Sequence, residues 1–304
     1  MNFYLPDKDS PSYFYKKFYD VDCIVSDIDG TLTFGEMPIT QQIIQKTENL
    51  RYKNVVTTIA TGRPFRGAHG VIRALGISEG TPLLFYNGAV LLEYSTGGVV
   101  ESHTIPFDEA AEILNIVSGC QAGVYVYTCD ISKKNIFNTS GNGLHEQVYY
   151  IGGKVRNVDI NGNEVLPLTM NVLKQGSIVS ILIEKRDIPV EVCYQVMKFL
   201  KRNSNVSYTD SGNGFIEVCS MHNKKSIIVD ELRRRKAKNK IKKILAIGDN
   251  DNDIDLFKAA DISVAVANSS KKAKKSANYI CRKSDADGYL EMLTVIEKAK
   301  RLYW

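Results

Sequence analysis

The sequence predicts an α/β fold in which a doubly wound parallel sheet is interrupted by an inserted α+β domain. Apolar, strand-like runs alternate with segments of helical spacing over residues 21–90, and the same alternation returns from residue 215 onward. Such alternation is typical of a parallel sheet with helices on both faces. Between these parts, hairpin-like runs and turns rich in glycine and asparagine indicate a different architecture. A chain of 304 residues is long enough for two domains of about 150 residues each.

The individual elements are predicted from apolar spacing and from helix start and stop signals. In the first part we expect strands at 21–26, 54–60 and 82–86 and helices at 40–52 and 64–75. The second of these helices has Pro64 near its start and Gly76 just past its end, the positions that these residues prefer. In the last part we expect strands at 243–247, 262–266 and 279–281 and helices at 224–236, 251–259, 270–277 and 287–302.

These patterns predict a division of the chain into three parts. Residues 1–20, rich in Tyr, Phe, Lys and Asp, form an N-terminal arm that either packs on the surface or is a mobile tail. Residues 21–90 and 215–304 form the core, and residues 91–214 form the insertion. Within the insertion we expect a hairpin near 93–100, helices at 107–117 and 188–201, and strands at 124–127 and 178–184.

Composition excludes several classes of protein. The chain is 44% hydrophobic and 24% charged, as in ordinary globular proteins. No apolar run approaches the roughly 20 residues needed to span a bilayer, and the N-terminus lacks the pattern of a secretory signal. The six cysteines are dispersed without a C-x-x-C pair, which indicates reduced thiols. We therefore expect a cytoplasmic protein with no membrane partner, either a monomer or a homodimer.

The formal net charge of +5 is concentrated in two basic stretches, at residues 224–243 and 271–275. A basic stretch can bind nucleic acid. The alternative is a solvated helix face followed by a loop. Because no aromatic residues are interleaved for base stacking, the sequence favours the solvated face over a nucleic-acid partner.

An acidic pair, Asp27 and Asp29, follows the first strand of the core. Residues i and i+2 of a strand point to the same side, so the two carboxylates are expected to lie together. Adjacent carboxylates repel each other unless a cation or a proton neutralises them. The pair is either a solvated turn or a metal-dependent site with different roles for its two members, and the other strand ends decide between these readings.

Polar groups follow the other core strands as well. Ligands of open parallel sheets bind beyond the carboxyl ends of the strands. A hydroxyl and backbone N–H groups at a helix N-terminus suit an anion such as phosphate, and oxygen ligands without His or Cys favour Mg²⁺ over zinc. The residues delivered to this edge are Asp27, Asp29, Thr61, Gly62, Arg63, Asn87, Asp249, Asn252 and Asp253.

The acidic run Asp249-x-Asp251-x-Asp253 also resembles the start of an EF-hand loop. We reject this alternative because the sixth position would be Ile254 instead of glycine and the twelfth Ala260 instead of glutamate. The apolar strand in front of the run is also wrong for a helix–loop–helix.

Phosphate chemistry needs a cation besides the metal, and two adjacent lysines are candidates. In a helix, Lys225 would lie on the apolar stripe of Ile228, Val229 and Leu232, whereas Lys224 would lie nearer its border. The spacing favours Lys225 and leaves Lys224 as the alternative.

These motifs resemble the haloacid dehalogenase superfamily of phosphohydrolases, which has a Rossmann-like core. The ordered motifs are Asp-Ile-Asp-Gly-Thr-Leu, Thr-Gly-Arg, Lys and Gly-Asp-x-x-Asn-Asp, and the resemblance spans roughly residues 20–300. The insertion resembles the C2-type cap of the Cof-like subclass IIB, which implies that residues 91–214 set substrate specificity. The subclass resemblance also includes the motifs at Asn87 and Asn268.

The resemblance implies a role for each site residue. Asp27 would be the nucleophile that forms an aspartyl-phosphate, and Asp29 the general acid and base. Mg²⁺ would be held by the Asp27 carboxylate, the Asp29 backbone carbonyl and the Asp249 carboxylate. Phosphate would be bound by Thr61, Gly62, Lys225 and Asn252, and the supporting residues would be Asp253, Asn87, Asn268 and Arg63.

The resemblance therefore implies a Mg²⁺-dependent phosphomonoester hydrolase that acts on small phosphorylated metabolites, with sugar phosphates as the expected class. A phosphosugar mutase would share the aspartyl-phosphate and stays an alternative. A catalytically idle fold that binds nucleic acid or protein is a third reading, which the costly carboxylate cluster disfavours. Tyr125, Tyr127, Tyr149 and Tyr150 either contact the leaving group or pack within the cap.

Overall fold

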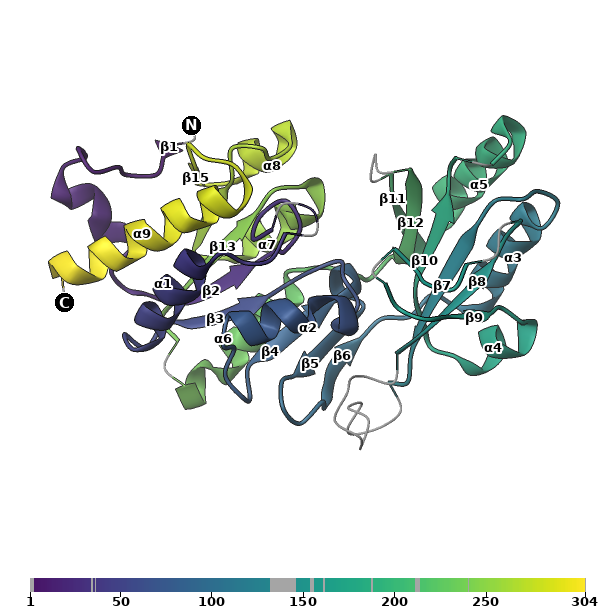
Figure 1. The fold of residues 1–304 in the computed structure, drawn as a ribbon, viewed down its shortest axis with the longest axis horizontal. Coiled ribbons are helices and arrows are strands. Elements are labelled where there is room, and N and C mark those ends of the chain that lie inside the picture. Colours follow the sequence, from purple (N-terminus) through teal and green to yellow (C-terminus); the bar gives the residue numbers. More distant parts are fainter. Residues whose placement is uncertain are drawn as a thin grey trace.

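The structure is a computed structural model of the 304-residue chain. It describes residues 3–33, 35, 37–131, 146–153, 156–160, 162–186, 188–210, 214–239 and 241–303. Figure 1 shows two parts side by side, a larger α/β core and a smaller part built on an antiparallel sheet. No helix in these ranges is long and apolar enough to cross a membrane.

The core is built on a six-stranded parallel sheet. Its order is β1 (Phe3–Tyr4), β15 (Tyr279–Ile280), β14 (Ile262–Ala265), β13 (Lys243–Gly248), β2 (Val21–Ser26) and β3 (Val56–Ile59). β2 lies between β13 and the edge strand β3, and Ser26 is level with Ile247 and Ile59. The segments that follow these three strands therefore leave the sheet at the same edge.

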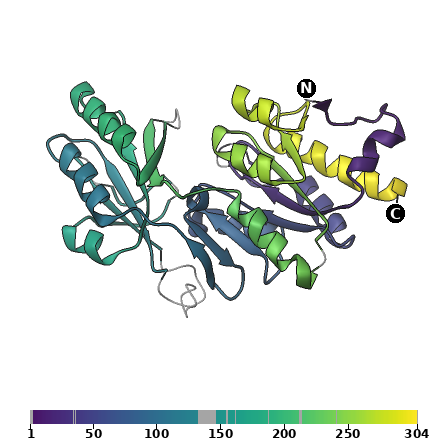
Figure 2. The ribbon, with the colours of Figure 1, turned by 180° about the vertical axis from the view of Figure 1, so that it is seen from behind.

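Helices cover both faces of the parallel sheet, as Figures 1 and 2 show from opposite sides. Successive strand residues point to opposite faces, so Ile24 packs in one hydrophobic cluster, while Cys23 and Val25 pack in the other. The helices on the Ile24 face are α1 (Gln41–Arg51), α2 (Phe65–Ala74) and α9 (Asp285–Tyr303). Those on the opposite face are α6 (Ile227–Asn239), α7 (Ile254–Ala259) and α8 (Lys271–Ser276). The predicted doubly wound core is confirmed.

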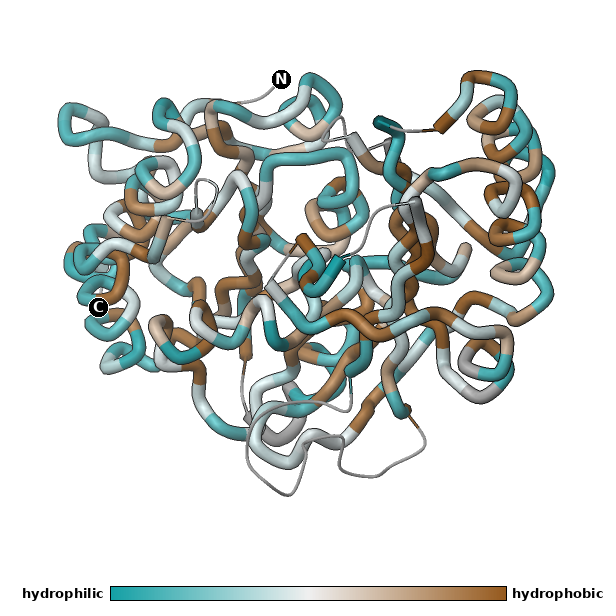
Figure 3. The backbone as a smooth tube through the Cα atoms, turned by 45° about the vertical axis from the view of Figure 1, so that its right-hand side comes forward, coloured by the Kyte–Doolittle hydropathy of each residue, from teal (hydrophilic) through white to brown (hydrophobic). Residues whose placement is uncertain are grey.

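The cap has its own mixed, mainly antiparallel sheet. Its order is β11 (Val206–Asp210), β12 (Phe215–Ser220), β10 (Ile178–Glu184), β7 (Val124–Cys129), β8 (Glu146–Ile151) and β9 (Val165–Pro167). The helices packed on it are α3 (Phe107–Val117), α4 (Met170–Gln175) and α5 (Val190–Arg202). Val124 and Val126 point to these helices, whereas Tyr125 and Tyr127 belong to the cluster shared with the core. Figure 3 shows hydrophobic residues along the inner strands, whereas hydrophobic and hydrophilic residues alternate along the outer helices.

A small antiparallel sheet and two connections join the cap to the core. The sheet consists of β4 (Pro82–Phe85), β5 (Val90–Glu93) and β6 (Val99–Ser102), and it meets β3 at the Ala60–Leu84 bridge. The chain passes from β6 to α3 and returns from β12 to α6. The sequence placed the residues of β6 in the cap and those of β12 in the core. In the structure, β6 pairs in the small sheet that meets β3 of the core, whereas β12 pairs in the cap sheet. The domain boundaries stay a prediction, because sheet membership alone does not define a folding unit.

The N-terminal arm packs against the core over residues 3–20. β1 pairs in parallel with β15, and a short 3₁₀ helix, η1 (Ser12–Lys17), lies against α9. Leu5, Tyr15 and Phe18 are buried. Of the two alternatives for the arm, the structure shows the packed one.

Most predicted elements agree with the structure to within a few residues, but the helix expected at 224–236 begins later. α6 starts at Ile227, because the Ser226 N–H donates to the Asp255 carboxylate and its carbonyl accepts the first helical bond, from Val229. Lys224 and Lys225 therefore precede the helix, and the helical spacing used to distinguish them does not apply.

Candidate active site

The centre of the site is a buried group of two carboxylates and one ammonium at the end of β2. Asp27 follows β2 directly and is 5% exposed, and its N–H donates to the Ile247 carbonyl of β13. The Lys225 Nζ lies 2.9 Å from the Asp27 Oδ1 and 2.7 Å from the Asp253 Oδ1. Lys225 is 1% exposed, whereas Lys224 is exposed. The structure therefore places Lys225, and not Lys224, beside the acidic pair.

Asp253 holds the loop after β13 in place. Its Oδ2 accepts hydrogen bonds from the N–H groups of Asp249, at 2.9 Å, and Asn250, at 3.0 Å. Its other oxygen accepts from Lys225. A fully buried carboxylate is tolerated only when it is paired and hydrogen-bonded, and both of these oxygens have partners. Asp253 thereby fixes the position of Asp249 and of Lys225 together.

Asp249 lies against the turn that contains Asp29. Its Oδ1 accepts from the Thr31 Oγ1 at 3.2 Å. A Cβ atom at Gly30 would lie 2.6 Å from the Asp249 Oδ2, and Gly30 has φ +75°, so a side chain would both clash and be strained there. The glycine of the first motif is thus needed for the close approach of two strand-end loops.

A metal ion fits the carboxylates at this edge. One oxygen from each of Asp27, Asp249 and Asp253 lies within 4.8 Å of the others. The donors are all hard oxygens, which suit Mg²⁺ or another hard divalent cation. The Asp253 oxygens already accept from two N–H groups and Lys225, so Asp27 and Asp249 are the carboxylates better suited to hold the ion.

Burial and mutual repulsion change the ionisation of this cluster. Burial raises the pKa of Asp27 well above its ordinary value, although the charge of Lys225 opposes this rise. Burial and the nearby Asp253 charge raise the pKa of Asp249 to about 6. Burial disfavours the ammonium form of Lys225, but its two carboxylate partners outweigh burial and raise its pKa. Excess carboxylate charge of this kind favours binding of a cation.

Asp29 has surroundings unlike those of Asp27. Its side chain is 56% exposed, and the Arg63 guanidinium donates to both of its oxygens, from Nε at 2.8 Å and from Nη2 at 2.5 Å. Arg63 also donates to the Gly67 carbonyl of α2. The sequence predicted that the carboxylates of Asp27 and Asp29 lie together. In the structure, Asp27 is paired with Lys225 and Asp29 with Arg63. The Asp29 side chain is not in the three-carboxylate cluster, and metal binding through its backbone carbonyl stays a prediction.

The segments after β3 and β4 supply neutral polar groups. Thr61 is fully buried, its Oγ1 accepts from the Arg63 N–H at 3.0 Å, and Gly62 packs closely on Asn87. The Asn87 Oδ1 accepts from the Asn252 Nδ2 at 2.9 Å, which joins the β4 and β13 ends. Phosphate binding by Thr61, Gly62 and Asn252 stays a prediction.

Asn268 lies on the other side of the Gly30 turn. Its Nδ2 donates to the Gly30 carbonyl at 2.9 Å and to Asp285 at 2.9 Å. The structure thus gives Asn268 contacts that stabilise this turn.

Comparison with known proteins identifies the family. A sequence model of the haloacid dehalogenase-like hydrolases matches residues 24–293. The chain belongs to this family. A phosphoglycolate phosphatase of Methanobrevibacter smithii is 24% identical over 278 residues, covering 90% of this chain and 97% of the relative. A 5-amino-6-(5-phospho-D-ribitylamino)uracil phosphatase of Bacillus subtilis is 21% identical over 277 residues, covering 89% of this chain and 95% of the relative.

A solved structure supports the fold. A sugar phosphatase of subclass IIB of the haloacid dehalogenase superfamily has a TM-score of 0.68 and 19% identity, covering 91% of this chain and 99% of that structure. The predicted family, the fold class and the prediction of an enzyme of the phosphatase type are confirmed. Residues 3–20 lie outside the match with the family model, which begins at residue 24.

Two cap carboxylates that contact the hydrolase core were missed by sequence reasoning. Glu146 of β8 accepts hydrogen bonds from the Phe65 and Arg66 N–H groups, and Glu217 of β12 accepts from the Asn87 Nδ2 at 3.0 Å. Neither belongs to a motif of the family quoted above. No local signal in the sequence distinguishes either glutamate from an exposed one.

The sheet edge that carries Asp29 opens into a cleft between the hydrolase core and the cap. Its volume is about 720 Å³. Asp29 and Arg63 line it from the core, and Tyr127, Phe215 and Glu217 from the cap. Tyr127 donates to the Asp159 carboxylate, so this tyrosine both lines the cleft and bonds within the cap.

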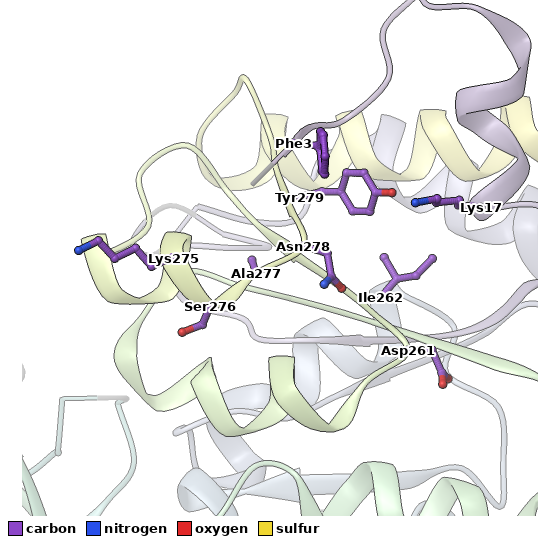
Figure 4. Close-up of a pocket in the computed structure, with 9 residues that line it drawn as sticks. All are labelled: Phe3, Lys17, Asp261, Ile262, Lys275, Ser276, Ala277, Asn278 and Tyr279. Carbon is purple, nitrogen blue, oxygen red and sulfur yellow. The ribbon is translucent and has the colours of Figure 1, made fainter. Parts of the chain in front are cut away.

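A second hollow, of about 440 Å³, lies on the hydrolase core away from the cleft (Figure 4). Asp261 and Ile262 line it at the start of β14, and Asn278 and Tyr279 at the start of β15. In a parallel sheet the strand starts lie opposite the strand ends, so this hollow is remote from Asp27.

Proposed function

We propose that this chain is a Mg²⁺-dependent phosphomonoesterase that hydrolyses small phosphorylated metabolites through an aspartyl-phosphate on Asp27. The observation that carries the proposal is the buried contact of Lys225 with Asp27 and Asp253, next to Asp249. A fold without catalysis gains nothing from a carboxylate cluster whose ionised form is disfavoured by burial. The shared family supports the same chemistry.

In the first half-reaction, an Asp27 oxygen attacks phosphorus, and the bond from phosphorus to the leaving-group oxygen breaks. Lys225 and the Thr61 hydroxyl stabilise the charge on the transferring phosphoryl group. Asp29 gives its proton to the leaving oxygen. An arginine fork binds an ionised carboxylate, so this step requires Arg63 to release Asp29 when the substrate enters.

In the second half-reaction, a water molecule attacks the phosphorus of the aspartyl-phosphate. Asp29 takes a proton from this water, the bond to the Asp27 oxygen breaks, and inorganic phosphate is released. Asp27 and Asp249 would hold Mg²⁺, whose positive charge would reduce the repulsion between the carboxylate and the phosphate. Asp253 keeps Lys225 and the Asp249 backbone in place during both steps.

The proposed substrates are phosphoesters with a small polar leaving group, with sugar phosphates first. The cleft of about 720 Å³ accommodates such a molecule. Phe215 and Tyr127 offer apolar surface, and Ser180 and Glu217 offer acceptors for hydroxyl groups. The named substrates of the relatives, among them a sugar phosphate and phosphoglycolate, define the panel to be tested.

The proposal is tested with Asp27→Asn and a generic aryl phosphate in the presence of Mg²⁺ or EDTA. We expect at least about a thousandfold loss of turnover, because the amide is a poor nucleophile. Asp251→Asn is the matched control, since Asp251 lies in the same acidic loop but its carboxylate accepts from Ser270 and Lys272 at the surface. Unchanged turnover in a folded Asp27→Asn variant, or full activity in EDTA, would overturn the proposal.

A further inference from the structure

Helix α2 begins beside the predicted phosphate-binding residues and has no cap of its own. The N-cap position is Pro64, which makes no side-chain hydrogen bond to the helix. The first N–H groups of any α-helix lack partners within the helix and need an acceptor from elsewhere. In α2 the acceptor must therefore come from outside the local sequence.

The acceptor is the carboxylate of Glu146, which lies on the cap strand β8 about 80 positions further along the chain. The Glu146 Oε1 accepts from the Phe65 N–H at 2.7 Å, and its Oε2 accepts from the Arg66 N–H at 3.1 Å. The Tyr86 hydroxyl donates to Oε1 at 2.9 Å. Glu146 is 4% exposed, so the contact excludes most water. Figure 1 shows α2 on the side of the core that faces the cap.

The segment that Glu146 holds is continuous with the catalytic machinery. Arg63 lies two residues before Phe65, and its guanidinium binds both Asp29 and the Gly67 carbonyl of α2. Thr61 accepts from the Arg63 N–H. A shift of the α2 start would therefore move the groups that hold Asp29 and that face the phosphoryl site.

We propose that Glu146 is a positioning residue through which the cap fixes the start of α2, and with it Thr61 and Arg63. The inference rests on the proposed phosphatase function and deepens it. Cap movement away from the core would break three hydrogen bonds and expose both the carboxylate and the helix end to water. The phosphate-binding segment is then fully ordered only while the cap is docked.

The start of α2 requires an acceptor with two oxygens, one for the Phe65 N–H and one for the Arg66 N–H. The N-terminus of a helix carries partial positive charge, which favours a carboxylate there. Burying this carboxylate without partners would be costly, so its three donors also restrict the docking geometry. Glutamine keeps one acceptor oxygen and the same length, whereas alanine keeps neither.

The test compares Glu146→Ala, Glu146→Gln and Gln147→Ala in the Mg²⁺-loaded enzyme with an aryl phosphate substrate. Gln147 is the matched control, because it is the next residue of β8 and is exposed. We expect Glu146→Ala to lower kcat/KM about tenfold or more and to weaken inhibition by inorganic phosphate, since displaced binding groups cost rate. Glu146→Gln should recover part of both effects, and Gln147→Ala should match the wild type.

Hydrogen exchange at the Phe65 and Arg66 amides gives a second readout, measured in the inactive Asp27→Asn background. Faster exchange at these two amides in Glu146→Ala is expected, with little change at the α2 C-terminus. A Glu146→Ala enzyme with lower thermal stability but normal kcat, KM and phosphate inhibition would overturn the proposal, as would unchanged exchange. If the wild type lacks phosphatase activity, the proposed function fails, whereas the exchange experiment still decides the role of Glu146.

Discussion

The core and the cap present polar groups to the same cleft in different ways. In the core, Asp27, Lys225 and Asp253 are buried and partner one another, and none of these contacts involves the cap. The cap instead lines the cleft mainly with aromatic and apolar side chains and contacts core polar groups through Glu146 and Glu217. Under the proposed function, the core therefore supplies the nucleophile and its cation without the cap, whereas the cap controls access to the cleft and aligns Thr61 and Arg63.

The physical reason lies in the two kinds of sheet. Neighbouring parallel strands end at one edge, so loops that are far apart in sequence deliver their side chains to one point. The cap sheet, by contrast, buries one face against its own helices and turns the other toward the cleft. Its groups meet the core only where the two parts dock. Variants in the core should therefore affect chemistry more strongly than variants in the cap.

Among the variants that test this difference between core and cap, Lys225→Met is expected to lower kcat/KM the most. Removal of the buried ammonium takes away the cation beside Asp27 and leaves Asp253 with one fewer donor. We expect kcat/KM to fall by about 10²–10³-fold, as for other groups that stabilise a developing charge. Steady-state kinetics with an aryl phosphate measures the effect.

Lys224→Met is the matched control for this variant. Lys224 is adjacent in sequence but exposed, so its loss should leave kcat/KM within about twofold of the wild type. Equal losses in the two variants would contradict the assignment of the phosphate-binding cation to Lys225. Circular dichroism of both variants separates misfolding from lost chemistry.

A smaller effect is expected from competition between protons and Mg²⁺ for the carboxylate cluster of Asp27, Asp249 and Asp253. Burial and Asp253 raise the pKa of Asp249 to about 6 in the metal-free chain. A raised carboxyl pKa makes the metal-free protein less stable as pH increases from the ordinary value of 3.8 to about 6, because the unfolded state loses its proton first. Below pH 6, protons compete with Mg²⁺, and its apparent Kd should rise up to about tenfold per pH unit.

Isothermal titration of Mg²⁺ and melting curves from pH 5 to pH 8 measure both consequences. Mg²⁺ should raise Tm more at pH 8 than at pH 5. Asp251→Asn should keep the same pH dependence, because its carboxylate is outside the cluster. A Mg²⁺ affinity that is constant over this range would exclude Asp249 as a ligand that titrates near 6.

The core could be predicted from the sequence further than the cap could. Asp27, Thr61 and Asp249 follow apolar runs that were predicted as parallel strands. Because parallel strands end at the same edge of a sheet, this prediction alone places the three residues there. Lys225 was predicted as the inward lysine, but from a helical spacing that the structure does not show, since α6 begins at Ile227. Lys225 is instead buried in the segment before α6, where the next residue, Ser226, donates its N–H to the Asp255 carboxylate.

The contacts between core and cap were beyond prediction from one sequence. The Glu146–Phe65 bond joins residues 81 positions apart, and the Glu217–Asn87 bond joins residues 130 positions apart. Such pairs depend on how the cap docks on the core, which neither periodicity nor local motifs predict. The carboxylates of the cap carry no local signature, because a buried glutamate in a strand has the same pattern as an exposed one.

The smallest change in kcat is expected for Glu217→Gln, a variant of the cap. Glu217 is held by Asn87, and glutamine keeps an acceptor for the same bond, so kcat for an aryl phosphate should change by less than about threefold. Burial raises the pKa of Glu217, so the wild type loses stability relative to Glu217→Gln as pH rises above the ordinary value of 4.5. The Tm difference between the two proteins should therefore increase from pH 4 to pH 8 in favour of the variant. A large loss of kcat in Glu217→Gln would instead place this cap carboxylate among the groups that act on the phosphoryl transfer, and the division of roles between core and cap would fail.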